Sequence, residues 1–327
     1  KYPYWDDVKY KYLRYNLYMK KLILTIVIAL LITPACFASD NYIVYAGNAS
    51  STKPSKQIQN MEKEVRNFFK NQLVYTNTGN IEALKKMYTN KYINADGFDK
   101  ETYFDLVQKT LKMYPDIKYT MDITKVSIIG NTAVVEIVEK ATASSVEAVG
   151  ETDITGYLKS YSNSIYYLEK NGDNWYITSD QIINERTTLT YGEANDIKMD
   201  LIVPQLVPAN KPYTASLNID VNDGKMIVIA SIGQEKITYP QINSEESYRK
   251  LPESGILERI FTANKDNLNE YTVASIGITR AKLAKNKDVK LLVTGLGYII
   301  TRTNIIPEKN FKVVENGKKE TTAKSVE

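Results

Sequence analysis

The spacing of apolar residues divides the chain into a helical stretch followed by a strand-rich stretch. From Gln57 onward, apolar residues recur close to every 3.6 positions, which is the period of an amphipathic helix. Asn80 and Asp99 are good N-cap residues for two further helices, and Pro115 ends the last of them. The pattern therefore predicts three helices between residues 57 and 114.

After Pro115 the apolar residues alternate with polar ones, which indicates strands that are buried on one face. The predicted strands are Ile117–Ile129, Thr132–Thr142, Tyr157–Glu169 and Asn174–Ile183. Asn171-Gly172 is a strong hairpin signal between the last two. Helices followed by a run of strands predict the α+β class, with the helices on one face of an antiparallel sheet.

The rest of the chain predicts a second, all-β domain. Thr187–Asp196 is polar and separates a first domain, 57–190, from a second, 196–306. Short strands at regular spacing in 196–306 favour a β-sandwich of immunoglobulin-like type, on architecture only. A polar, charged tail at 307–327 predicts disorder.

The N-terminal region predicts export. Lys20-Lys21 follows Met19 and precedes an apolar run, Leu22–Ile32, which is shorter than the about 20 residues needed to cross a bilayer. We interpret residues 19–38 as a signal peptide and expect a periplasmic or extracellular protein. The alternatives are an uncleaved membrane anchor and a lipoprotein with a lipidated Cys36, the two ways in which this chain would reach a membrane.

The segments on either side of the signal peptide contribute little to the fold. Residues 1–18 are interpreted as sequence translated from upstream of the natural start, the alternative being a genuine extension. Residues 39–56 predict a flexible lead-in.

Composition excludes several classes of function. The chain holds 42 Lys+Arg and 38 Asp+Glu, and removing the six bases and two acids of residues 1–38 leaves 36 of each. A neutral mature chain gives no basic stripe for nucleic acid. The chain has no His, and its single Cys is Cys36, so Ser–His and Cys–His catalytic pairs and His or Cys zinc sites are excluded. We expect neither a metal nor a cofactor.

Residues 57–185 resemble the nuclear transport factor 2-like superfamily, which includes ketosteroid isomerases and polyketide cyclases. The segment that carries the resemblance runs from Thr78-Gly79-Asn80 through Glu82-Ala83-Leu84 to Met87-Tyr88. The resemblance implies a cone-shaped domain of three helices and a curved antiparallel sheet around an apolar pocket. It also implies that two copies can pair through their sheets as a homodimer.

The isomerase branch of that superfamily uses an Asp base with a Tyr and a protonated Asp as hydrogen-bond donors. By the resemblance, Asp96 takes the position of the base, Gln72 that of the Tyr, and Ser164 lies near that of the second acid. Tyr88 is a further pocket candidate. The alternative for Asp96-Gly97 is a simple turn, because Asp-Gly pairs are common turn formers.

Three hypotheses for function follow. The first is an exported binding or accessory protein of the bacterial envelope, with a small apolar ligand or an envelope protein as partner. The second is an isomerase or cyclase with Asp96 as general base. The third is a structural scaffold whose cone is filled by its own side chains. An open cavity with Asp96 pointing inward favours the enzyme, and a filled cone favours the scaffold.

Overall fold

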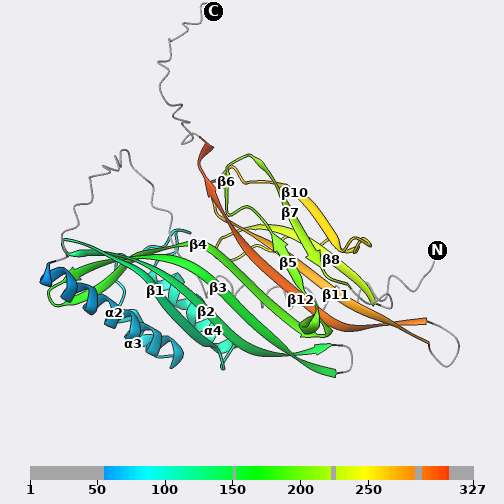
Figure 1. Cartoon of the computed structure of the whole chain (residues 1–327), viewed down its shortest axis with the longest axis horizontal. Helices are drawn as coiled ribbons and strands as arrows, with labels where there is room; N and C mark the ends of the chain where they lie inside the picture. The colour runs from blue at the N-terminus through cyan, green and yellow to red at the C-terminus, as the bar shows by residue number, and fades with distance from the viewer. Residues whose placement is uncertain (1–54, 150–151, 222–225, 284–288, 309–327) are drawn as a thin grey trace, which may run out of the picture.

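The computed structural model describes residues 55–149, 152–221, 226–283 and 289–308, and these form a mainly β protein (Figure 1). The described part holds the α-helices α2 (Lys56–Asn77), α3 (Ile81–Lys86) and α4 (Lys100–Met113). Other predictions fall on residues outside the described ones: the extension 1–18, the signal peptide 19–38 with Cys36, nearly all of the lead-in, and most of the tail.

The three helices lie where the sequence predicts them. The side chain of Asn80 accepts a hydrogen bond from the backbone of α3, and that of Asp99 accepts one from Thr102 in α4. Gly79 separates α2 from α3 with a φ of 65°, a left-handed conformation that favours glycine. In the described chain no helix is long and apolar enough to cross a membrane.

Most strands belong to one large sheet with the order β1-β2-β3-β4-β12-β11-β8-β9, in which neighbours pair antiparallel. Its strands are β1 (Lys118–Ile129), β2 (Thr132–Val149), β3 (Thr152–Asn171), β4 (Asn174–Gly192), β8 (Met226–Lys236), β9 (Arg249–Lys250), β11 (Glu270–Leu283) and β12 (Val289–Ile306). A short strand, β6 (Leu206–Pro208), pairs parallel with the end of β12.

A separate three-stranded sheet has the order β10-β7-β5. Its strands are β5 (Met199–Ile202), β7 (Pro212–Ile219) and β10 (Ile256–Thr262). A 3-10 turn, η1 (Glu193–Asp196), leads into it from β4. In Figure 1 the small sheet lies beside β8, β11 and β12, whereas the helices lie beside β1–β4.

The predicted fold class, an α+β cone followed by a separate all-β sandwich, is wrong. The protein is mostly strand, and β4 pairs with β12 from Arg186 opposite Thr301 to Gly192 opposite Gly295. Strands from both predicted domains therefore share one sheet. Thr187–Gly192, predicted as a polar linker, is strand because its threonines and Tyr191 favour extended backbone. Pairing between segments so far apart leaves no signal in local periodicity.

The two ends of the large sheet are covered on opposite faces. Successive residues of a strand point to opposite faces. On β12, Tyr298 packs in a cluster with Leu106 of α4, whereas Ile299 packs in a cluster with Leu217 of β7. We call these the helix face and the sandwich face of the large sheet.

The free edge of β1 is protected by side chains from α2. The amide of Asn77 donates to the carbonyl of Tyr119 (2.9 Å) and accepts from its N–H (2.8 Å). Arg66 donates to the carbonyl of Ile123 (3.4 Å). These bonds occupy backbone groups through which an exposed edge strand would pair with another chain.

Candidate functional site

A band of polar side chains crosses the helix face and separates two apolar clusters. We call it the polar belt; it consists of Glu139 on β2, Ser160, Ser162 and Ser164 on β3, and Asp180, Glu185 and Thr187 on β4. The cluster on one side includes Ile137, Tyr166 and Ile177, and the cluster on the other includes Ala141, Leu158 and Leu189. All members of the belt are buried except Glu139, which is partly buried.

The strand register places two carboxyl groups on either side of one serine. Ser162 is the partner of Glu139 on β2 and of Glu185 on β4. Side chains at directly opposite positions have Cβ atoms about 4.5–5.5 Å apart. Glu139, Ser162 and Glu185 therefore form one row across three strands.

Two bulges bring Asp180 and Glu185 to the helix face. The β3–β4 register shifts between Tyr167 and Leu168 and again between Asn163 and Ser164. Each shift changes which residues of β4 point inward. The buried positions of β4 accordingly run Ile177, Asp180 and Ile182 before they reach Glu185.

Two tyrosine hydroxyls bond to carboxyl groups of the belt, one from the segment between α3 and α4 and one from β3. Tyr92 donates to the two carboxylate oxygens of Asp180 (3.3 and 3.2 Å), and Tyr166 donates to Glu139 (3.0 Å). Tyr92 also packs edge-on against Tyr88, with ring centroids 5.0 Å apart. The aromatic residues thus close the belt on its helical side.

The predicted pocket residues Gln72 and Tyr88 meet in this region. Gln72 Nε2 donates to the hydroxyl of Tyr88 (3.0 Å), which lies 3.0 Å from the hydroxyl of Tyr103. Ser164, the third pocket candidate, is a member of the belt. The sequence-based candidates other than Asp96 therefore lie on the helix face (Ser164), in α2 (Gln72) and in the segment between α3 and α4 (Tyr88).

Burial makes the acidic groups of the belt hard to ionise. Removal from water raises the pKa of Glu139 to about 7, against a smaller opposing effect of Tyr166. Burial also raises the pKa values of Asp180 and Glu185 well above their ordinary range. Among the described residues, no Lys or Arg side chain bonds to any of these three groups.

Four buried polar atoms of this region have no hydrogen-bond partner. They are Gln72 Oε1, Ser162 Oγ, Ser164 Oγ and Glu185 Oε1. Leaving a buried donor or acceptor unsatisfied costs about 1–3 kcal/mol. Four such atoms in one region are a large penalty unless another molecule satisfies them.

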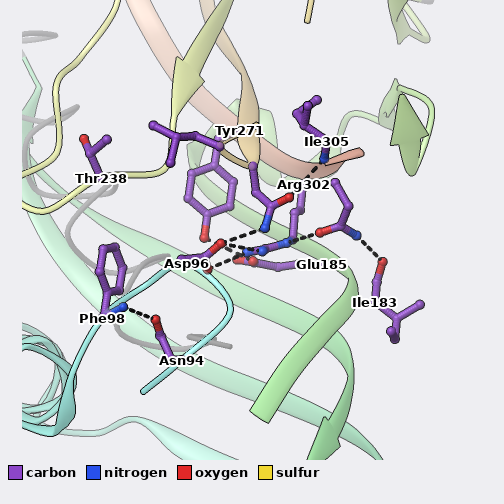
Figure 2. Close-up of polar contacts among 12 residues, drawn as sticks. Asn94, Asp96, Phe98, Ile183, Glu185, Thr238, Tyr271, Arg302 and Ile305 are labelled. Carbon is purple, nitrogen blue, oxygen red and sulfur yellow. Dashed lines mark hydrogen bonds and ion pairs between the residues drawn. The ribbon is translucent and has the colours of Figure 1, made fainter. Parts of the chain in front are cut away.

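Asp96, the predicted general base, forms a buried ion pair (Figure 2). Arg302 donates to its two oxygens (2.7 and 3.0 Å), and Asn269 donates to one of them (2.8 Å). The side chains of Arg302 and Asp96 are 0% and 2% exposed. Gly97 has a φ of 81° and donates to the carbonyl of Asn94, so Asp96-Gly97 also forms a turn. A carboxylate held by three donors is poorly placed to take a proton from a ligand.

The ion pair borders the polar belt. Glu185 interacts with the charge of Arg302, and its second oxygen accepts from the hydroxyl of Tyr271 (3.2 Å). Figure 2 shows Glu185 and Tyr271 beside the Asp96–Arg302 pair. Because Asp96 comes from the loop before α4 and Arg302 from β12, the pair ties the helices to the far half of the sheet.

A groove of about 610 Å³ lies on the outer side of this region, between α3, the start of α4 and the β3–β4 hairpin. Three lysines line it: Lys85, Lys86 and Lys100. Tyr88 also lines it, and the carbonyl of Tyr88 accepts from Lys100 (2.7 Å). In the described chain no three Asp, Glu, His or Cys side chains are placed to hold a metal ion.

Sequence reasoning missed most of the belt. Glu139 continues the alternation of Val135 and Ile137, so its inward position was detectable. The same holds for Ser162, which lies between Leu158 and Tyr166 in the alternation of β3. The inward positions of Asp180 and Glu185 could not be predicted, because the two bulges interrupt the alternation along β4.

No protein-family model matches the chain, and no curated protein matches it. Among solved structures, it is similar to Bd1075 of Bdellovibrio bacteriovorus, with 13% identity and a TM-score of 0.31 over 39% of this chain. It is also similar to a candidate scytalone dehydratase from Novosphingobium aromaticivorans (11%, TM-score 0.31) and to Kfla4162 of Kribbella flavida (10%, TM-score 0.32), each over 38% of this chain.

The chain spans 42% of the length of Bd1075, 84% of the second protein and 90% of the third. The last two have nuclear transport factor 2-like folds, but the similarity is at low TM-scores and covers only 38% of this chain. TM-scores near these values define neither the fold nor the function of this protein.

Proposed function

We propose that this protein is an exported binding module of the bacterial envelope, and that the polar belt holds a small molecule. The observation that carries the proposal is the set of four unsatisfied buried atoms around the Glu139–Ser162–Glu185 row. A ligand with hydrogen-bonding groups would satisfy these atoms and remove the energetic penalty. The ligand is then polar where it meets the belt, rather than wholly apolar as the sequence suggested.

Partial exposure at one end of the belt supports entry from solvent. Glu139 is partly buried, and so are Tyr103 of α4 and Tyr119 of β1, which pack against the same apolar cluster. A ligand that enters beside these residues would meet Glu139 first and Ser162 next.

Native mass spectrometry of the protein purified from its own host tests the proposal. We expect a stoichiometric small molecule on the wild-type chain and its loss from the Ser162→Val/Ser164→Val double variant. The matched control is Thr142→Val on the exposed face of β2, which should keep the molecule. A bare wild-type chain would contradict the proposal and favour the filled scaffold.

Proton transfer is a second candidate function, favoured by the carboxyl groups of the belt and their raised pKa values. A pKa of about 7 suits Glu139 to act as a general base, and a carboxyl group kept neutral, as burial keeps Asp180, can donate a hydrogen bond to a developing oxyanion. In this version Glu139 replaces Asp96 as the base. Deuterium incorporation from solvent into the bound molecule, absent in Glu139→Gln, would support it; equal incorporation in the variant would refute it.

A further inference from the structure

The polar belt is rich in carboxyl groups and poor in cations. Four buried or partly buried carboxyl groups lie in or beside it: Asp96, Glu139, Asp180 and Glu185. Among the described residues, Arg302 is the cation that interacts with this group, and its guanidinium is already bonded to both oxygens of Asp96. Glu139, Asp180 and Glu185 are therefore left without an ion-pair partner of their own.

The unsatisfied atoms also lack one kind of partner. Gln72 Oε1 is an acceptor, Glu185 Oε1 is an acceptor when that carboxyl group is ionised, and the hydroxyls of Ser162 and Ser164 can accept as well as donate. What is missing from the region is a group that donates several hydrogen bonds. The alkylammonium group provides up to three N–H donors and a positive charge.

Aromatic rings complete the surroundings that such a cation prefers. The rings of Tyr88, Tyr92 and Tyr103 lie 5.0–5.5 Å from one another, and the hydroxyl of Tyr92 bonds to Asp180. A cation is attracted to the faces of aromatic rings, most strongly where water is excluded. Acidic groups, unsatisfied acceptors and aromatic rings thus converge on one region.

We infer that the ligand of the polar belt is an organic ammonium ion, held between Glu139 and Glu185 with its N–H groups on Ser162 and the neighbouring acceptors. This inference rests on the proposed function, because it names the class of molecule that the belt binds. No bond is made or broken: the ammonium ion displaces water and satisfies atoms that the fold leaves unpaired.

Isothermal titration calorimetry with three probes separates charge from hydrogen bonding. Butylammonium brings both, tetramethylammonium brings charge without N–H donors, and 1-butanol brings a donor without charge. We expect butylammonium to bind at pH 8 at least about tenfold more tightly than either of the others, a difference of about 1.4 kcal/mol.

Binding should weaken at pH 5.5, because protonation of Glu139 removes one of the negative charges. The titratable groups that face Glu139 are Tyr166, Tyr88, Tyr103, Tyr119 and Asp180, and none of the tyrosines ionises in this range. The pH response between 5.5 and 8 therefore reports on carboxyl groups.

The variant Glu139→Gln should reduce butylammonium binding about tenfold. Its matched control is Glu136→Gln, on the same strand but on the exposed face, where Glu136 pairs with Lys125 (3.1 Å). Equal affinity for 1-butanol and butylammonium, or unchanged affinity in Glu139→Gln, would overturn the ammonium inference while leaving a polar ligand in place. Absence of binding by all three probes would also overturn it, and the mass-spectrometric result then decides the proposed function separately.

Discussion

Two carboxyl groups, Glu270 and Asp180, are each 1% exposed, yet they accept hydrogen bonds from different numbers of donors. Glu270, at the end of the sandwich face, accepts four hydrogen bonds: two from Asn264 (2.8 and 2.7 Å), one from Gln234 (2.7 Å) and one from Tyr213 (3.1 Å). Asp180, in the polar belt, accepts only from the hydroxyl of Tyr92, at 3.2–3.3 Å.

The difference separates a carboxylate that serves the fold from one that the fold leaves incomplete. Buried charge is tolerated when donors replace the lost water, as they do around Glu270. Around Asp180 a single hydroxyl replaces the lost water, and burial raises the pKa of this carboxyl group well above its ordinary range. The cluster between the two sheets, by contrast, consists of alanine, valine, leucine, isoleucine, tyrosine and phenylalanine side chains.

A third buried carboxylate, Asp96, gives the largest expected effect. Arg302→Met would leave Asp96 without its cation, and breaking a buried pair from one side costs about 3–5 kcal/mol. Urea unfolding at pH 7 measures the loss. The double variant Arg302→Met/Asp96→Asn should recover much of it, and equal stability of the single and double variants would contradict this account of the pair.

Two isosteric substitutions test the contrast between Glu270 and Asp180. Glu270→Gln replaces charge-assisted hydrogen bonds and should lose about 1.5–3 kcal/mol. Asp180→Asn should be neutral or stabilising at pH 8, because it removes a group that folding makes harder to ionise. Urea unfolding of both variants tests this, and an equal loss in the two would show that Asp180 is as well satisfied as Glu270.

The pH dependence of stability sharpens the comparison further. Below pH 4.5 Glu139 is protonated in both the folded and the unfolded chain, so it contributes nothing to the pH dependence. Between pH 4.5 and about 7 the unfolded chain releases this proton and the folded chain keeps it, so stability falls as pH rises. Unfolding midpoints should fall over this window in the wild type and fall less in Glu139→Gln. An identical slope in the two proteins would contradict the assignment.

The smallest expected effect concerns two serines of the belt. The hydroxyl of Ser160 lies 2.7 Å from that of Thr187, so Ser160→Ala should lose about 1 kcal/mol. The hydroxyl of Ser164 has no partner, so Ser164→Ala should lose no stability in the ligand-free protein, because it removes an unsatisfied buried group. Differential scanning calorimetry distinguishes the two, and the reverse order would mean that Ser164 is satisfied within the fold.

Local signals in the sequence predict elements well and their association poorly. The caps at Asn80 and Asp99 locate α3 and α4 correctly because capping is a property of neighbouring residues. The pairing of β4 with β12 was missed because it depends on residues far apart in the chain. The predicted strand Asn174–Ile183 also ends too early, since Thr187–Gly192 was interpreted as a polar linker.

The candidate site shows the same contrast between local features, which the sequence predicts, and contacts between distant segments, which it does not. Gln72 and Tyr88 were selected by resemblance, and they do bond to each other. Asp180 could not be placed inward from alternation, because a bulge shifts the register just before it. The ion pair of Asp96 with Arg302 could not be predicted, because its two residues lie far apart in the chain. The pairing of β4 with β12 was missed for the same reason.

A high-resolution crystal structure of protein purified from its own host tests the central claim most directly. We predict a bound molecule in the row of Glu139, Ser162 and Glu185, with donors directed at Ser162 Oγ and Glu185 Oε1. A belt whose side chains bond only to one another, with Ser162 donating to a neighbouring carboxylate and no molecule between them, would contradict it.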